Sequence, residues 1–312
     1  MGTLITGTSD VTPDIQGYYD RNLLERSLPM LIYGRFLQTR PLPSNSGTRI
    51  NFRRIESLPA NTTPLTEGVT PTGKKLTASD IYAYVKQYGD FITISDWVSM
   101  TGLDNLLVEG GEVLGEQLGL TIDTVQRDIL MGGTSVRLAN AVAARANVAT
   151  AVAAADAKAA VRMLRGANAK MIRKMIEGGP KVGTRPIPAA YYGITHTDCQ
   201  QDWEAIPGFK KVEEYPNQKN VMEEEIGSFG NLRILVTTNA KVYLSEGVAV
   251  GTTGLVASDS TNIDVYTTLI FGANAAGYIP LQKGNVKNII KKMGAGEDPL
   301  NQRSTSGWKA AT

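Results

Sequence analysis

The chain has 312 residues, of which 42% are hydrophobic and 20% charged, and its formal net charge is +2. This composition is typical of a folded, soluble protein, and the length suits one elaborate domain or two ordinary ones. A single cysteine and a single histidine exclude an internal disulfide and a Cys/His zinc site, which needs about four ligands.

The charge balance also gives little sign of a tight nucleic-acid binder. The 32 basic and 30 acidic residues are spread almost evenly along the chain, without the basic excess that phosphate binding favours. No secretory signal is expected, because the first thirty residues do not join a basic start to an apolar run. Residues 265–282 are uncharged but contain Gly272, Gly277 and Pro280, which is typical of strands and turns. We expect no membrane partner.

The N-terminal third alternates between irregular and extended segments. Residues 1–45 combine short apolar pieces with a helix-compatible run that Pro29 interrupts, which predicts an arm with one broken helix. Alternating polarity then predicts one strand over residues 49–55 and a second over residues 80–94.

The segment between these two strands, residues 56–79, is rich in Thr, Pro and Gly. Its sizeable apolar side chains are Leu58, Leu65, Val69 and Leu76. Burying four side chains does not offset the conformational entropy lost in ordering the whole segment, and an isolated two-stranded hairpin is marginal in water. We therefore expect this segment to be mobile in a lone chain and ordered against a neighbouring molecule.

A long helix is predicted from Thr101 to the pair Gly132 and Gly133, which suits a glycine C-cap. Its apolar face is expected to contain Leu107, Gly111, Leu114, Leu118, Ile122, Val125 and Ile129. Its opposite face is expected to contain Glu109, Glu112, Glu116, Asp123, Arg127 and Asp128. Such an acidic face is not suited to holding phosphate tightly.

The second half of the chain mixes short helices and strands. An alanine-rich stretch over residues 139–160 leads into a helix that is expected to continue through residues 171–176, toward a boundary at Gly178, Gly179 and Pro180. Strands are predicted over 189–195, 231–238, 263–272, 277–281 and 286–293, with a short helix over 197–206. The predicted fold class is α+β.

Two stretches invite a catalytic interpretation. Residues 68–75 nearly spell a phosphate-binding P-loop, but Lys75 occupies the position where a Ser or Thr would reach Mg²⁺, and the stretch lies inside the Thr/Pro/Gly segment. His196 and Cys199 are close enough in sequence to suggest a nucleophile and its base. For both stretches the favoured interpretation is structural: an exposed loop tip, and a strand-to-helix junction capped by Thr197 or Asp198.

The charged runs are Glu223-Glu224-Glu225, Arg53-Arg54, Lys210-Lys211 and Lys291-Lys292. We interpret them as solvated faces or as weak ion pairs between subunits, since such runs seldom form ligand sites.

The order of these parts resembles the major capsid proteins of tailed bacteriophages with the Hong Kong 97 type of fold, and within them the family typified by the coliphage N-four capsid. The segments that carry the resemblance run in order over nearly the whole chain; they are residues 35–38, 41–43, 50–54, 63–71, 87–91, 114–117, 196–198, 207–209, 225–228 and 298–303.

The resemblance implies a division into five parts and a structural role. The parts are an N-terminal arm (1–45), an extended hairpin loop (46–96), a peripheral domain with the spine helix (97–150), an axial domain (151–280) and a return to the peripheral domain (281–312). Copies would assemble as hexamers and pentamers into an icosahedral virion capsid, formed in the host cytoplasm around double-stranded DNA that they contact weakly. Portal, scaffold and decoration proteins are further expected partners, and no catalytic, cofactor or metal site is implied.

Candidate intersubunit residues come from the extended loop, because the resemblance places that loop across the adjacent subunit. They are Arg53, Arg54, Leu58, Leu65, Glu67, Val69, Lys74, Lys75 and Leu76. Two alternatives stay open: the shell protein of a bacterial nanocompartment, which would share the fold, and a cysteine-dependent hydrolase that uses Cys199.

Overall fold

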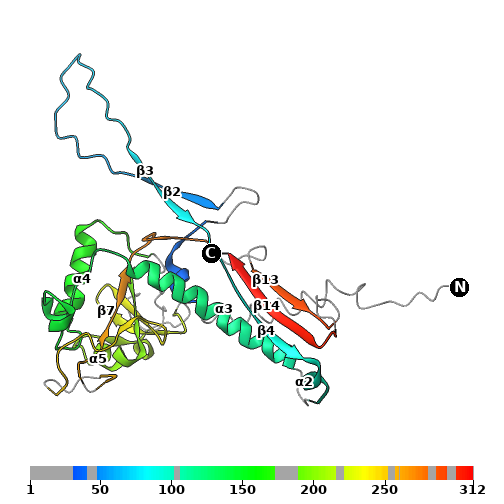
Figure 1. The fold of residues 1–312 in the computed structure, drawn as a ribbon. Coiled ribbons are helices and arrows are strands. Elements are labelled where there is room, and N and C mark those ends of the chain that lie inside the picture. The colour runs from blue at the N-terminus through cyan, green and yellow to red at the C-terminus, as the bar shows by residue number, and fades with distance from the viewer. Residues whose placement is uncertain are drawn as a thin grey trace, which may run out of the picture.

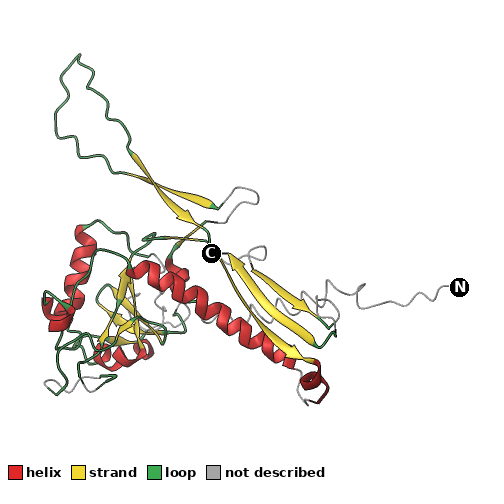
Figure 2. Ribbon diagram, in the orientation of Figure 1, coloured by secondary structure: helices red, strands yellow, loops and turns green. Residues whose placement is uncertain are grey.

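The structure is a computed structural model that describes residues 31–40, 48–101, 106–172, 189–215, 221–251, 257–259, 261–279, 286–293 and 300–311. One long helix, α3 (Leu106–Met131), joins a small sheet at one end to a larger mixed body at the other (Figure 1). A two-stranded hairpin projects away from both bodies. Figure 2 shows the strands gathered in separate groups that the helix connects.

The long helix confirms the main prediction of the sequence and differs at its start. The expected start at Thr101 instead closes a separate short helix, α2 (Asp96–Thr101). The C-terminal end lies where it was expected: the N–H groups of Gly132 and Gly133 donate to the carbonyls of Ile129 and Leu130, at 3.1 and 3.3 Å. The glycine pair therefore satisfies carbonyls that the last helical turn leaves free.

The sheet beside α3, which we call the peripheral sheet, is antiparallel in the order β13–β14–β4. Its strands are β4 (Gln87–Ser95), β13 (Val286–Lys291) and β14 (Arg303–Ala311). Leu114, Leu118 and Ile122 of the helix pack against Trp308 and Ala310 of β14. The Trp308 indole N–H also donates to Gln117 Oε1 at 3.1 Å, so the helix and sheet are joined by both apolar and polar contacts.

The single strand expected over residues 80–94 is two strands in two different sheets. β3 (Ala78–Tyr84) pairs with β2 (Arg49–Ile55) in the projecting hairpin, and β4 pairs with β14 along its whole length. Residues 87–95, placed in the extended loop by the sequence division, therefore lie in the peripheral sheet. The alternation predicted extended backbone correctly, but it carries no signal for a change of partner.

The larger body is built on a five-stranded sheet in the order β11–β5–β8–β7–β6, which we call the axial sheet. Its strands are β5 (Tyr191–His196), β6 (Lys210–Lys211), β7 (Glu225–Phe229), β8 (Leu232–Thr237) and β11 (Leu269–Phe271). β5 and β8 are parallel, and the other pairs are antiparallel.

Both faces of the axial sheet are covered. One face packs Tyr191 and Ile234 against α4 (Ala154–Gly166) and α5 (Gln200–Glu204), with Trp203 fully buried. The other face packs against the 3₁₀ turn η2 (Tyr33–Phe36) and Leu130 near the end of α3. The body is thus a three-layer α+β core, as the predicted fold class required.

Short elements complete the described chain. The two-stranded pairs are β1 (Gln38–Thr39) with β12 (Gly277–Tyr278), which is parallel, and β9 (Val242–Tyr243) with β10 (Val265–Tyr266), which is antiparallel. Single 3₁₀ turns are η3 (Ala139–Ala141), η4 (Arg145–Asn147), η5 (Thr197–Cys199) and η6 (Val212–Glu214).

Several sequence predictions about the second half need correction. The helix expected to continue to residue 176 ends at Gly166, and Asn168 has a left-handed φ of 53° that no helix continues through. The strand expected over 263–272 is broken into β10 and β11. Strands β1, β6, β7, β9 and β14 were not predicted. Of the arm predicted over residues 1–45, residues 1–30 and 41–45 lie outside the described residues, and residues 33–36 form the 3₁₀ turn η2. The boundary expected at residues 178–180 also lies outside the described residues.

Candidate intersubunit contact surface

The projecting hairpin is held by its own backbone ladder and by few side chains. β2 and β3 pair from Arg49–Tyr84 to Ile55–Ala78, and the ladder extends to Glu56, whose N–H donates to the Thr77 carbonyl at 3.0 Å. Across the strands, Arg53 pairs with Asp80 at 3.0 Å. The ladder fixes the register, and a long loop over residues 57–76 is left beyond it.

The loop reverses direction at a tight turn. Val69 N–H donates to the Thr66 carbonyl at 3.2 Å, and Gly68, the third residue of this turn, has φ of +76°. A positive φ at that position is the type II geometry that favours glycine. Nothing lies within 4 Å of a Cβ placed on Gly68, so the glycine is required by the backbone and not by crowding.

All nine candidate residues predicted from the sequence lie on this hairpin and are exposed. Leu65 is 74% exposed and Leu76 is 65% exposed, although both are large apolar side chains. Lys74 donates to the Pro59 carbonyl at 3.2 Å, which crosses the base of the loop without covering any apolar side chain.

A second group of exposed apolar side chains, which was not predicted from the sequence, lies on the strands themselves. They are Ile55, Ile81, Tyr82 and Tyr84. Alternation suggested that one face of each strand would be buried, yet β3 exposes residues on both faces. At the base of the hairpin Ile50 is buried and Arg40 lies over the Phe52 ring, whereas the side chains beyond this base lack a covering layer among the described residues.

A second apolar surface lies on the outer face of the peripheral sheet, away from α3. It forms a groove of about 920 Å³ in which Phe91 is 66% exposed and Ile289 is 43% exposed. Lys291, Arg303 and Lys309 also line it, so the groove is apolar at its floor and basic at its edges. Of these residues, the sequence analysis had noted Lys291 as part of a charged run.

The two stretches with a catalytic appearance lack the required surroundings. The P-loop-like residues 68–75 lie in the exposed loop, and no helix follows them. Burial raises the pKa of Cys199 to about 11, whereas a cysteine nucleophile needs its pKa lowered. His196 Nδ1 accepts the backbone N–H of Asp198 at 3.2 Å, as part of the 3₁₀ turn.

The acidic run of residues 223–225 is not one solvated face. Glu223 is exposed, Glu224 pairs with Arg35 at 2.8 Å, and Glu225 is fully buried beside Arg233. Glu225 Oε1 accepts Arg233 Nε–H at 2.6 Å and the Tyr215 hydroxyl at 3.0 Å. The three glutamates therefore differ in burial: Glu225, the first residue of β7, is buried, Glu224 is largely covered beside Arg35, and Glu223 alone is exposed.

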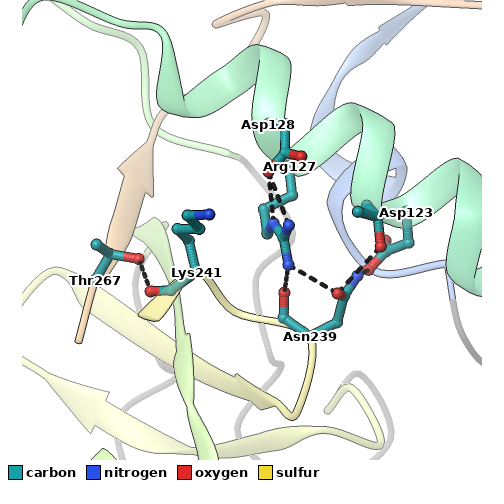
Figure 3. Close-up of polar contacts among 7 residues, drawn as sticks. Asp123, Arg127, Asp128, Asn239, Lys241 and Thr267 are labelled. Carbon is teal, nitrogen blue, oxygen red and sulfur yellow. Dashed lines mark hydrogen bonds and ion pairs between the residues drawn. The ribbon is translucent and has the colours of Figure 1, made fainter. Parts of the chain in front are cut away.

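The face predicted as acidic on the long helix is interrupted where the helix meets the larger body (Figure 3). Asp123 was expected on that face but is fully buried, whereas Ile129, expected on the apolar face, is 73% exposed. Asp123 Oδ1 accepts the backbone N–H groups of Ile32 and Tyr33 at 2.9 and 3.1 Å, and its Oδ2 accepts Asn239 Nδ2–H at 2.9 Å.

Arg127, one turn further along α3, completes this junction. Its Nη1 donates to the backbone carbonyl and to the side-chain oxygen of Asn239, both at 2.9 Å (Figure 3). Burial raises the pKa of Asp123, and the hydrogen bonds from Asn239, Ile32 and Tyr33 act in the opposite direction. One buried carboxylate thus ties the spine helix, the residues before η2 and the loop after β8 together.

Two other kinds of site have no counterpart in the described residues. These residues contain no cluster of three or more His, Cys, Asp or Glu side chains placed to bind a metal ion. None of the helices described is both long and apolar enough to cross a membrane.

Comparisons with known proteins give a clear result for the fold and none for the sequence. No protein-family model matches the chain, and no curated protein sequence matches it significantly. Among solved structures, the capsid of Ralstonia phage GP4 has a TM-score of 0.61 and 14% identity over 89% of this chain and 82% of that chain. The capsid of cyanophage P-SCSP1u has a TM-score of 0.56 and 15% identity over 90% and 83%.

The head structure of Helicobacter pylori bacteriophage KHP40 is similar to the same extent, with a TM-score of 0.55 and 15% identity over 88% of this chain and 78% of that chain. The α+β fold of this protein is therefore that of phage capsid proteins, the Hong Kong 97 type expected from the sequence.

Proposed function

We propose that this chain is the major capsid protein of a tailed bacteriophage. Copies assemble as hexamers and pentamers into an icosahedral head that encloses double-stranded DNA, and the role is structural and not catalytic. The observation that carries this proposal is the projecting hairpin: a capsid-type fold presents a row of exposed apolar side chains that its own chain does not cover. In a monomeric protein such a surface would promote aggregation, whereas in a shell it has a neighbour to contact.

The groove on the outer face of the peripheral sheet offers a matching surface for the hairpin of a neighbouring copy. Leu65, Val69 and Leu76 of the hairpin are exposed, and so are Phe91 and Ile289 of the groove. Burying both sets together removes apolar area from water on both partners, at about 25 cal/mol per Å². Because the groove is basic at its edges, Glu67 is the candidate loop residue whose charge suits that rim, and Arg53, Arg54, Lys74 and Lys75 would lie away from it.

The proposal also covers the inner surface of the head. Glu109 of α3 is exposed and Glu112 and Glu116 are half-buried, and Arg127, the basic residue within the helix bounds, is held by Asn239. A wall of this kind binds phosphate weakly, so packaged DNA could slide along it. Assembly in the host cytoplasm, with portal and scaffold or decoration proteins as partners, belongs to the same proposal.

The finer assignment to the coliphage N-four family rests on the sequence segments quoted above. A nanocompartment shell would have the same fold and would differ in its cargo. The contents of the particle therefore distinguish a nanocompartment from a phage head. A cysteine-dependent hydrolase is disfavoured by the raised pKa of Cys199 and by the pairing of His196 with its own turn.

Expression of the full chain, followed by sedimentation velocity and negative-stain electron microscopy, tests the proposal. We expect closed polyhedral particles, and particles that contain nucleic acid and no enzyme when they are recovered from infected cells. Particles filled with a cargo enzyme would replace the phage assignment with the nanocompartment one. A protein that stays monomeric at all concentrations, with or without scaffold protein, would contradict a shell function altogether.

A further inference from the structure

A basic groove lies on the larger body. It has a volume of about 480 Å³ and runs between α4 and the turn that joins β7 to β8. Lys158, Arg162 and Arg165 of α4 line it and are all exposed. Their spacing of four and three residues places them along one side of the helix.

The floor of this groove is apolar, and only some of the cations at its rim contact other groups of the chain. The Lys158 ammonium lies 5.9 Å from the centre of the Phe229 ring, and Arg165 donates to Asn231 Oδ1 at 2.8 Å. None of the three cations takes part in an ion pair within the described part of the chain. The groove therefore presents unneutralised positive charge beside an apolar floor, which suits carboxylate side chains with their methylene groups.

Carboxylates of that kind are exposed at the opposite end of the same sheet. Residue pairs place Phe229 against Leu232 near the basic groove and Glu225 against Leu235 at the far end of the β7–β8 pair. Glu213 and Glu214 of η6 follow β6 toward this far end, and Glu223 precedes β7 there. These three side chains are exposed, and none of them takes part in an ion pair among the described residues. Lys211, which pairs with Glu204, is near enough to attract Glu213 and Glu214 electrostatically, and it leaves Glu223 unaffected.

We propose that the basic groove of α4 receives the acidic end of the axial sheet, Glu213, Glu214 and Glu223, from the next copy of this chain in the same ring. The proposal rests on the shell function proposed above, because it concerns contacts inside its hexamers and pentamers. A closed ring needs a heterologous interface, in which two different patches of one chain are complementary. Opposite charge at opposite ends of one sheet supplies such a pair of patches, and it opposes the reversed, like-charged pairing.

Packaged DNA is the other polyanion that the cations of α4 could contact. The apolar floor formed by Ala157, Val161 and Phe229 disfavours it, because phosphate contacts gain nothing from such a floor. Only the contact between copies requires the acidic end of the axial sheet. Reversal of the acidic charges therefore distinguishes a contact between copies from a contact with DNA.

The test is a charge swap in the full-length protein. Reversing the groove alone (Lys158→Glu, Arg162→Glu, Arg165→Glu) should lower the yield of closed particles by about tenfold or more, since like charges then face each other. Reversing the acidic end alone (Glu213→Lys, Glu214→Lys, Glu223→Lys) should do the same. Combining both sets in one chain should restore much of the yield, and Lys170→Glu, an exposed cation outside the groove, should change nothing.

The readouts are particle yield by sedimentation and electron microscopy, with circular dichroism to confirm that each variant is folded. If the groove-reversed variant assembles as wild type but holds less DNA, the cations serve DNA and the proposal is overturned. If both single reversals fail and the combined variant fails equally while remaining folded, the two patches do not meet and the proposal is again overturned. If the wild-type chain forms no particles at all, the shell function fails first, so the two failures are distinguishable.

Discussion

The projecting hairpin exposes large apolar side chains, whereas the axial sheet buries a pair of charged ones. The axial sheet buries an ion pair, Arg233 with Glu225, at 1% and 0% exposure, whereas the hairpin leaves Leu65 74% exposed. Both regions are β-structure in one chain, and they differ in what covers them. Helices α4 and α5 cover one face of the axial sheet, and η2 with the end of α3 covers the other, whereas no helix covers the hairpin. The axial body is stabilised within the chain, and in the proposed shell the hairpin would be covered by another copy.

The largest expected effect comes from removing the uncovered region. We would replace residues 57–76 with Asn-Gly, which joins the hydrogen-bonded residues Glu56 and Thr77 through a two-residue type I′ turn. We expect a folded monomer whose free energy of unfolding stays within about 1 kcal/mol of wild type, because the loop contributes no core. The same variant should form no closed particles by electron microscopy.

A full-length control separates loop length from loop chemistry. In it, Leu58, Leu65, Val69 and Leu76 all become serine, and we expect the same loss of particles with an intact loop. Normal shells from the shortened chain would show that the hairpin is dispensable for assembly, and the contrast between the two regions would then have no functional meaning.

The second prediction concerns the buried ion pair of the axial sheet. Glu225→Ala leaves the Arg233 guanidinium buried without its carboxylate, which costs about 3–5 kcal/mol of unfolding free energy. Urea denaturation of the variant at neutral pH measures this loss. The double variant Glu225→Ala with Arg233→Met should recover most of the stability, since an apolar replacement of both partners removes the unpaired charge.

The recovery in the double variant is the sharper result. A double variant as unstable as Glu225→Ala would show that the network with Tyr192 and Tyr215 matters beyond the charge pair.

The third prediction concerns Asp123, where the spine helix meets the axial body. Asp123→Ala leaves the backbone N–H groups of Ile32 and Tyr33 without an acceptor, and we expect a loss of about 2–3 kcal/mol. Asp123→Asn keeps an oxygen acceptor and should lose less. Because one carboxylate joins three segments, both variants should also protect fewer amides around residues 31–36 from hydrogen exchange.

The pH dependence of this site follows from the raised pKa of Asp123. The folded state keeps the proton to a higher pH than the unfolded state does, whose pKa is about 3.9. As pH rises from that value through the folded pKa, the free energy of unfolding should fall for wild type relative to Asp123→Asn. Urea titrations of both proteins across this window measure the difference, and parallel pH profiles would contradict a raised pKa.

The sequence predicted the regions that follow local rules and missed those set by tertiary partners. The helix around Leu114, Leu118 and Ile122 has a clear period, so its type and its C-terminal end were predictable. The buried face of the helix was not predictable beyond Ile122. There η2 and Asn239 contact the opposite side of the helix, so Asp123 is buried and Ile129 is exposed.

The exposure of the loop residues Leu58, Leu65, Val69 and Leu76 was predictable for a different reason: the composition of their segment cannot sustain a core, and this property is visible in one chain. Their contact with a neighbouring copy stays a prediction. The groove around Phe91 and Ile289 was missed, since residues from β4, β13 and β14 meet only after strands separated by about two hundred positions have paired.

The smallest expected effect belongs to the hairpin's own ion pair, Arg53 with Asp80, which mirrors the buried pair in chemistry and differs in exposure. The Arg53 side chain is 66% exposed and that of Asp80 is 28% exposed, so water and salt screen their attraction. We expect Arg53→Ala to leave the urea midpoint of the monomer unchanged, and Arg54→Ala, next to it on β2, serves as the matched control. A shift in the Arg53 variant alone would mean that this exposed pair stabilises the hairpin without a neighbour. If the stability of the monomer is unchanged but fewer particles assemble, Arg53 contributes to the contact with another copy, where its charge is removed from water.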